Sequence, residues 1–206
     1  MNPPLDFIHQ FTPGTSGRTL LLLHGTGGDE TDMVPLGRRI DSGAALLSPR
    51  GKSPENGMPR FFRRLAEGVF DEEDLNFRTD ELATFVGDAA KHYQLDPRRV
   101  VAVGYSNGAN IAGALLLLRP GILAGAALLR PMVPIVPPNP PNLAGVPVLI
   151  AAGNDDPIVP PENARHLETL LQRAGAEVES HFENAGHRLT NQTIDLTSRW
   201  LARIAV

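Results

Sequence analysis

One stretch decides the fold of this chain: Val100-Val101-Ala102-Val103-Gly104-Tyr105-Ser106-Asn107-Gly108-Ala109-Asn110-Ile111. It begins as an apolar, β-branched run, which is typical of a buried strand, and continues as an Ala- and Leu-rich helix. Between them lies a G-x-S-x-G pattern, which predicts that Ser106 sits in a tight, strained turn. Gly104 and Gly108 flank the serine because a Cβ at either position would clash with the neighbouring strand and helix. The N-terminus of the following helix offers free N–H groups to a developing oxyanion. The alternative interpretation of the motif is an ordinary glycine-flanked turn.

Composition limits the class of protein. The 206 residues fit a single domain, 1–206, with a sizeable core. The net charge of -4 and the lack of a basic patch argue against a nucleic-acid partner. The absence of cysteine excludes disulfides, thiolate metal sites and a cysteine nucleophile.

From the N-terminal residues and the apolar runs, neither a signal peptide nor a membrane span is expected. The first six residues lack the charged region and apolar core of a signal peptide. The apolar stretch 111–118 is too short to cross a bilayer, so no membrane insertion is expected. We therefore expect a cytoplasmic enzyme.

Apolar strands alternate with helical patterns along the chain. This alternation predicts an α/β fold, with a mostly parallel, doubly wound sheet, helices on both faces and no room for a large cap domain. The expected strands are 7–11 at an edge, 19–23, 44–47, a strand from 100, 124–129, 146–152 and 177–182. One expected helix follows a cap at Thr31 or Asp32, and another follows Ser106. Three more are expected at 75–93, 162–173 and 190–204.

Two segments do not fit this alternation. Residues 50–76 are irregular and long for a plain connection, and residues 130–147 are rich in proline. Long loops in compact domains are often functional, so either segment is a candidate lid over the site. The proline-rich segment and the edge near residue 7 are also candidate homodimer contacts.

A serine hydroxyl needs a base to remove its proton, and the base needs an acid to orient it. In a doubly wound sheet, reactive groups gather beyond the carboxyl ends of the strands. Asp155 and Asp156 follow one late strand and His187 follows the next, which gives the chain order Ser, Asp, His. Asp156 is favoured because Pro157 fixes an extended turn after it, whereas Asp155 is expected to cap or bind locally.

The other histidines are weaker candidates for the base. His24 also follows a strand, but it precedes the serine, and its expected role is to hold the glycine-rich loop by hydrogen bonds. His181 is expected at an exposed strand position. The remaining ones, which are expected on the surface or in the core, are His9, His92 and His166.

Two backbone N–H groups are expected to form an oxyanion hole. One is that of Asn107, directly after the nucleophile, and the other is that of Thr26 in the loop after the strand 19–23. A phosphate cradle is the alternative for this glycine-rich loop, but the loop matches neither common phosphate-binding motif. No cofactor and no metal are predicted. The candidate pocket walls, each of which is equally a candidate core residue, are Met58, Phe61, Phe62, Phe70, Met132, Ile158 and Leu189.

Taken together, the motifs resemble those of the carboxylesterase/phospholipase family of α/β-hydrolases, which includes dienelactone hydrolase relatives. The segments that carry the resemblance are 21–28, 104–110, 153–160 and 186–187. Within the family, the sequences of residues 55–64 and 67–75 resemble those of the bacterial branch that is often labelled hydroquinone-specific hydrolases. The resemblance covers residues 18–204.

The resemblance implies a triad of Ser106, Asp156 and His187, with the amides of Thr26 and Asn107 as the oxyanion hole. In the family the acid directly precedes the proline, which supports Asp156. Dienelactone hydrolases proper use a cysteine, which this chain lacks. Family thioesterases usually carry Gly-Phe-Ser-Gln-Gly, and Tyr105 and Asn107 depart from that pattern.

These observations favour a serine carboxylesterase that acts on small carboxylic esters. An alternative keeps the same triad but applies it to aromatic or quinone-derived compounds, to thioesters or to lysophospholipids. A third hypothesis, from a different class, is a non-catalytic binding protein on a hydrolase scaffold. A fluorophosphonate probe separates the enzymes from the binding protein, because only an activated serine reacts with it.

Overall fold

The computed structural model describes residues 5–205 of the chain, and its centre is a seven-stranded sheet. The strand order is β1-β3-β2-β8-β9-β10-β11. Only β1 runs antiparallel, at the edge, and every other pair of neighbours is parallel. The bounds are β1 His9–Thr12, β2 Thr19–Leu23, β3 Ala45–Pro49, β8 Val100–Tyr105, β9 Gly125–Leu129, β10 Pro147–Gly153 and β11 Glu177–Glu183.

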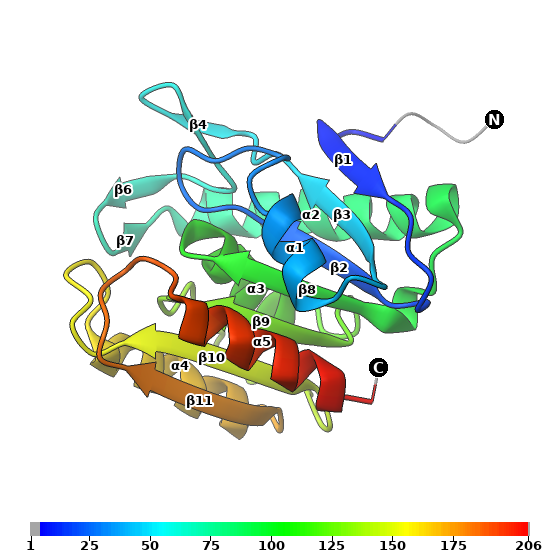
Figure 1. Cartoon of the computed structure of the whole chain (residues 1–206). Helices are drawn as coiled ribbons and strands as arrows, with labels where there is room; N and C mark the ends of the chain where they lie inside the picture. The colour runs from blue at the N-terminus through cyan, green and yellow to red at the C-terminus, as the bar shows by residue number, and fades with distance from the viewer. Residues whose placement is uncertain (1–4, 206) are drawn as a thin grey trace.

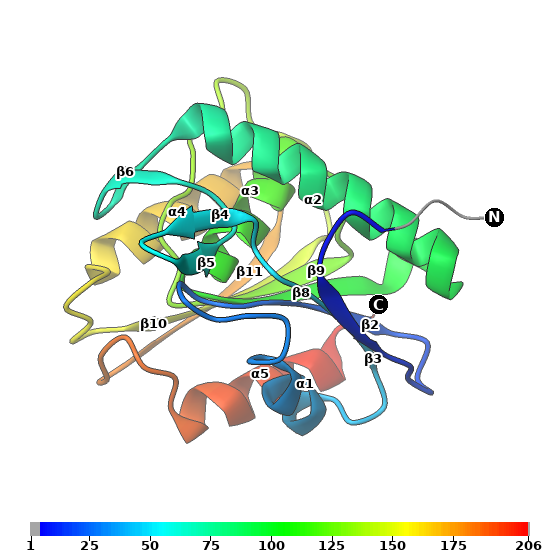
Figure 2. The same ribbon diagram turned by 90° about the horizontal axis from the view of Figure 1, so that it is seen from above.

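Helices cover both faces of this sheet, as the sequence predicts. Figures 1 and 2 show α2 (Glu72–Tyr93), α3 (Asn107–Leu118) and α4 (Pro161–Arg173) on one face. The other face carries α1 (Val34–Ile40) and α5 (Asn191–Arg203). A short 3-10 helix, Pro97–Arg99, leads into β8. The predicted doubly wound α/β architecture is therefore observed.

The sequence of β2 explains why the sheet is buried on both faces. All of its residues are buried, and their side chains alternate between two cores. Leu21 and Leu23 belong to the core under α2, α3 and α4, whereas Leu20 and Leu22 belong to the core under α1 and α5. Successive side chains of a strand point to opposite faces, so only a continuous apolar run satisfies both cores.

The segment 50–76 is more regular than the sequence suggested. It forms two small hairpins, β4 (Ser53–Glu55) with β5 (Met58–Arg60), and β6 (Arg64–Ala66) with β7 (Val69–Phe70). The first hairpin turns at Asn56 and Gly57, and both residues have positive φ. Asn-Gly is the strongest short-range hairpin signal, so this turn was readable in the sequence.

The predicted cap of α1 is wrong. The N-cap is Met33, which makes no side-chain hydrogen bond, and Asp32 instead accepts from the Asp29 N–H at 3.2 Å. Helix α2 begins earlier than predicted, because the Asp71 carboxylate accepts from the Asp74 N–H at 3.1 Å and caps it.

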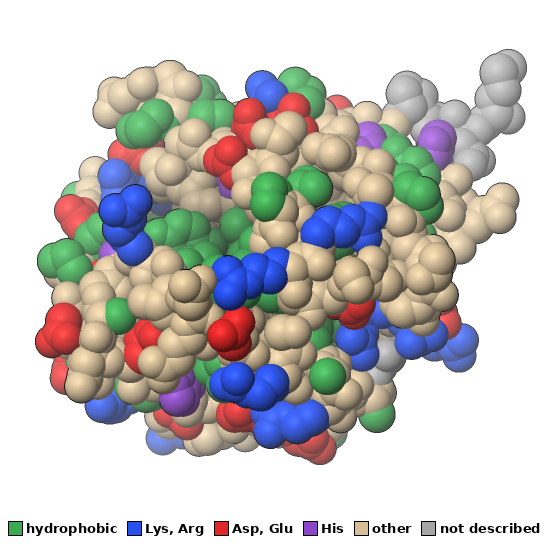
Figure 3. Space-filling model, in the orientation of Figure 1, with side chains coloured by type: hydrophobic (Ala, Val, Ile, Leu, Met, Phe, Trp, Pro, Cys, Tyr) green, Lys and Arg blue, Asp and Glu red, His purple; other side chains and the backbone are tan. Residues whose placement is uncertain are grey.

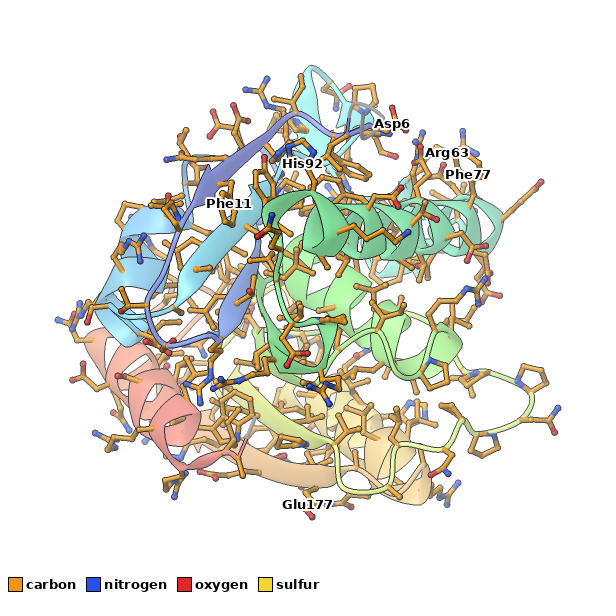
Figure 4. All side chains as sticks on the ribbon, turned by 90° about the vertical axis from the view of Figure 1, so that its right-hand side faces the viewer. Asp6, Phe11, Arg63, Phe77, His92 and Glu177 are labelled. Carbon is orange, nitrogen blue, oxygen red and sulfur yellow. The ribbon has the colours of Figure 1, made fainter. Side chains whose placement is uncertain are left out.

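The two edges of the sheet are visible in Figure 4, which labels Phe11 of β1 and Glu177 of β11. At the β1 edge the Phe11 ring stacks on Tyr93 of α2, with 3.8 Å between ring centroids. The proline-rich segment runs without helix or strand from β9 to β10. At its start, the Met132 N–H donates to Asn110 Oδ1 of α3 at 2.7 Å, which fixes this part of the segment against α3. Only this start lines the cavity described below.

Candidate active site

Ser106 lies at the turn between β8 and α3, at the centre of the sheet. Its backbone has φ 53° and ψ -114°, a strained conformation for a residue with a Cβ. A Cβ added to Gly108 would collide with the Leu23 carbonyl of β2, and one added to Gly104 would collide with the backbone of Gly108. These two glycines therefore permit the close approach of helix and strands that produces the turn.

Ser106, His187 and Asp156 form a continuous hydrogen-bonded chain. Ser106 Oγ lies 2.9 Å from His187 Nε2, and His187 Nδ1 lies 2.8 Å from Asp156 Oδ2. An ionised carboxylate accepts only, so Nδ1 carries the proton and Nε2 is free to accept the serine hydroxyl proton. The three side chains that the sequence singles out thus meet although they come from loops after β8, β10 and β11.

Asp156 is held rigidly by its own loop. Its Oδ1 accepts from the N–H groups of Ile158, at 2.8 Å, and Val159, at 3.0 Å, which leaves Oδ2 for the histidine. The side chain is 1% exposed. Asp155 is exposed to solvent and is not part of the hydrogen-bonded chain.

Arg130 holds the loop that carries His187. It follows β9, is 1% exposed, and donates to the carbonyls of Gly186, at 3.0 Å, and Arg188, at 3.2 Å, on either side of the histidine. It also pairs with Glu183, to which Thr190 and Thr193 donate as well. Burial alone would raise the pKa of Glu183, but the hydrogen bonds from Thr193, Arg130 and Thr190 outweigh it and lower that pKa.

Tyr105 and His24 each hold a backbone segment near the site. The Tyr105 hydroxyl donates to the His187 carbonyl at 3.3 Å, and burial raises the pKa of Tyr105. His24 bonds the Gly25 carbonyl through Nδ1, at 2.7 Å, and accepts the Gly51 N–H through Nε2, at 2.9 Å. Burial lowers the pKa of His24, which favours the neutral ring that this pair of bonds requires. His24 therefore holds its loop.

The candidate oxyanion donors lie next to the serine. Thr26 follows β2 and Asn107 is the first residue of α3, and both line the cavity that contains Ser106. Within residues 5–205 neither backbone N–H has a hydrogen-bond acceptor. Both groups are therefore available to a ligand oxygen.

The cavity has a volume of about 400 Å³ and opens to solvent between the hairpins and the loops after β10 and β11. Figure 3 shows this face of the molecule, which is hollowed on the side of β6 and β7, with hydrophobic side chains in the hollow. Its walls combine apolar and charged groups. The principal lining side chains are Arg60, Arg64, Glu67, Phe70, Tyr105, Asn110, Met132, Ile158 and His187.

Of the pocket walls predicted from the sequence, Phe70, Met132 and Ile158 line this cavity. Phe61 and Phe62 do not, because both are buried in the core. Met58 lies beside Gly27 with its side chain partly exposed, and Leu189 packs against the core under α1 and α5. The pocket assignment is therefore corrected for these four residues.

Three polar residues of the site were missed by the sequence reasoning. Arg130 follows an apolar strand at the same edge as the triad, which is a usable signal. Tyr105 lies within the G-x-S-x-G motif. Arg60 lies in a segment without an element prediction, and nothing local marks it.

No cluster of three metal-ligating side chains occurs among residues 5–205. None of the helices in that range is long and apolar enough to cross a membrane.

A family model described as the dienelactone hydrolase family matches residues 63–198. The chain is 50% identical, over 192 residues, to the protein named "Putative hydrolase MhqD" of Bacillus subtilis (strain 168), and the match covers 93% of this chain and 96% of that protein.

Two solved structures of carboxylesterases superpose closely on this chain. The Bacillus cereus carboxylesterase superposes with a TM-score of 0.94 and 52% identity, over 96% of this chain and 94% of the other. A carboxylesterase from Mesorhizobium loti superposes with a TM-score of 0.90 and 38% identity, over 99% and 100% of the two chains. Both matches span nearly whole chains.

Proposed function

Because the chain belongs to the dienelactone hydrolase family, we propose that it is a serine carboxylesterase that hydrolyses small carboxylic esters through an acyl-enzyme on Ser106. The family and the neighbouring carboxylesterases support a hydrolase of esters. One observation carries the serine mechanism: the hydrogen-bonded chain from Ser106 Oγ through His187 to Asp156, at 2.9 and 2.8 Å. A neighbouring base of this kind is what makes a serine hydroxyl nucleophilic.

In the first half-reaction, Ser106 Oγ attacks the ester carbonyl carbon while His187 Nε2 takes the hydroxyl proton. The carbonyl oxygen becomes an oxyanion beside the N–H groups of Thr26 and Asn107, each of which is expected to contribute roughly 3 kcal/mol to transition-state stabilisation. Asp156 remains ionised and stabilises the imidazolium through its bond to Nδ1. His187 then protonates the departing alkoxide, and the acyl group stays on Ser106.

In the second half-reaction, water replaces the alcohol. His187 takes a proton from that water, which attacks the acyl carbon, and the same N–H groups receive the second oxyanion. When the oxyanion collapses, the carboxylic acid leaves and the proton returns to Ser106 Oγ. Arg130 and Tyr105, which hold the backbone at His187, keep the imidazole in place through both steps.

The size of the cavity favours short acyl groups. About 400 Å³ must hold the acyl part, the alcohol part and the reacting atoms. The rim side chain Ile158 is 40% exposed, so a long chain would lie on the open surface. We therefore expect turnover to peak at short esters and to decline for long ones.

Hydrolysis of p-nitrophenyl esters from acetate to palmitate, with Ser106→Ala as the comparison, tests this proposal. We expect turnover that requires Ser106 and is highest for short chains, together with covalent labelling of Ser106 by a fluorophosphonate. A Ser106→Ala protein that keeps its rate would refute the serine mechanism. A marked preference for long-chain triglycerides at an oil–water surface would refute the short-ester preference.

A further inference from the structure

We infer that the strap Pro59-Arg60-Phe61, at the end of the β4–β5 hairpin, positions both oxyanion donors, and that Arg60 is a positioning residue for the reaction. This inference rests on the proposed esterase function and concerns the same site. The strap lies outside the central sheet, in the segment for which the sequence predicts no element.

Three hydrogen bonds join the strap to the two oxyanion segments. The Gly27 N–H donates to the Pro59 carbonyl at 2.9 Å, and Arg60 Nη1 donates to Thr26 Oγ1 at 2.6 Å. The Phe61 N–H donates to Asn107 Oδ1 at 2.7 Å. Consecutive strap residues therefore bond the loop after β2 and the first residue of α3 at the same time.

The loop after β2 needs such a support. It contains Gly25, Gly27 and Gly28, and Gly27 has φ 84°, so its backbone has more conformational freedom than an ordinary loop. Within the loop, the Gly28 N–H bonds the Gly25 carbonyl at 3.1 Å. An oxyanion hole works only when both donors are fixed before the reaction, because reorganising them would consume the stabilisation that they provide.

Arg60 is held firmly enough to serve as this support. Its side chain is 4% exposed, and its Nε donates to the Phe62 carbonyl at 3.2 Å and pairs with Glu55 at 3.2 Å. Burying a guanidinium is costly unless its charge is paired and its N–H groups are bonded. The Thr26 hydroxyl accepts one of those N–H groups, so the arginine and the oxyanion loop fix one another.

The strap also ties the two donors to each other. Thr26 follows β2 and Asn107 follows β8, and a small shift between these loops would change the distance between their N–H groups. Asn107 is 2% exposed, and its Oδ1 is occupied by the strap. Displacing the strap would therefore disturb both donors while leaving the Ser106–His187–Asp156 hydrogen bonds intact.

The test compares Arg60→Met with Arg63→Met. Methionine keeps much of the apolar volume but removes the bond to Thr26, together with the bond to the Phe62 carbonyl and the pair with Glu55. Arg63 belongs to the same segment, but its side chain is 65% exposed, pairs with Asp71 and makes no hydrogen bond to either oxyanion loop. We expect Arg60→Met to lower kcat about 10- to 100-fold, which is part of the loss caused by removing one donor outright, with KM within about 3-fold of wild type. Arg63→Met should keep the wild-type kcat.

A spectroscopic measurement separates positioning from general destabilisation. The infrared carbonyl stretch of the acyl-enzyme, labelled with ¹³C at the carbonyl carbon, reports the hydrogen bonds to that oxygen. We expect the stretch to move to higher frequency in Arg60→Met, because the bonds from Thr26 and Asn107 become longer, and to stay in place in Arg63→Met. Arg60→Lys, which keeps a donor, should recover part of both effects.

A second variant repeats the test from the other side of the bond. Thr26→Val removes the hydroxyl acceptor but keeps the backbone N–H, so it should lower kcat and shift the carbonyl stretch in the same direction. Adding Arg60→Met to Thr26→Val should then lower kcat little further, because both changes remove the same bond between Arg60 and Thr26. The bond of Arg60 to Phe62 and its pair with Glu55 are lost only in Arg60→Met, and we expect that loss to lower stability. If Arg60→Met does not fold, Thr26→Val carries the test alone.

An unshifted carbonyl stretch in Arg60→Met and Thr26→Val, or a loss confined to KM, would overturn the inference. That result leaves the proposed function standing as long as Ser106→Ala abolishes turnover. If no acyl group forms on Ser106 of the wild-type protein, the proposed function itself fails.

Discussion

Replacement of Arg130 by methionine should destabilise the protein strongly. The guanidinium is fully buried, and it donates to Glu183, to the Ala151 carbonyl and to the carbonyls on either side of His187. The Glu183 side chain is 6% exposed, so Arg130→Met leaves a carboxylate without its countercharge inside the protein. Removing one partner of a buried ion pair costs about 3–5 kcal/mol, and we expect a loss of that size in the free energy of unfolding.

A double variant tests whether the unpaired charge of Glu183 causes this loss in the free energy of unfolding. Glu183→Gln removes the charge and keeps one carbonyl oxygen. That oxygen can replace only one of the two carboxylate oxygens to which Thr190 and Thr193 donate separately, and the amide NH2 takes the place of the other. If the stranded carboxylate dominates, Arg130→Met/Glu183→Gln should be more stable than Arg130→Met. The coupling free energy between the two changes should be about 1–3 kcal/mol.

The assay is equilibrium unfolding in urea at neutral pH, with kcat measured on the same samples under native conditions. A double variant as unstable as the sum of the two single changes would refute the reasoning. We also expect the double variant to have reduced kcat, because the Gly186 and Arg188 carbonyls have lost their common donor.

The pH dependence offers a second check on the same pair. The pKa of Glu183 in the folded protein lies below its ordinary value of 4.5. The folded state therefore binds fewer protons than the unfolded state in this range, so the stability from Glu183 is fully present above about pH 4.5 and is lost as the pH falls through the lower, folded pKa. Glu183→Gln should remove this part of the acid sensitivity.

Three further changes have clear expected outcomes. Asp156→Asn keeps an Oδ1 acceptor for its own loop but loses the charge that orients His187, so kcat should fall by about 10³- to 10⁴-fold with little change in melting temperature. A loss of kcat below about 10-fold would contradict the role assigned to Asp156. Gly108→Ala forces a Cβ against the Leu23 carbonyl and should cost about 3 kcal/mol or more in urea unfolding, whereas Gly87→Ala in the open middle of α2 should cost nothing. The pKa of His24 in the folded protein is lowered from its ordinary value of 6.5, so its contribution to the free energy of unfolding is fully present above pH 6.5 and is lost as the pH falls through the folded pKa. Urea midpoints measured between pH 7.5 and pH 5 should show this decline. An unchanged decline in His24→Asn would contradict this assignment.

Much of the fold was determined by local patterns in the sequence. The apolar runs of β2 and β8 predict buried parallel strands because side chains on both faces of such a strand must be apolar. The triad candidates could be chosen for a related reason. Parallel strands present their carboxyl ends at one edge, so residues far apart in sequence that each follow a strand are brought together. The tight turn at Ser106 is equally local, since its glycines are required by neighbouring backbone.

Other features were decided only by the tertiary structure. An apolar residue in an irregular segment has no period that tells which way it points, so Phe61 and Phe62 proved to be core while Phe70 lines the cavity. The bond from Arg60 to Thr26 joins residues 34 positions apart, and the pair of Arg130 and Glu183 joins residues 53 positions apart. Such pairings depend on how loops dock on the finished sheet. The sequence by itself therefore determined which chemical groups meet at the edge of the sheet, and the packing of the loops decided which side chains hold them in place.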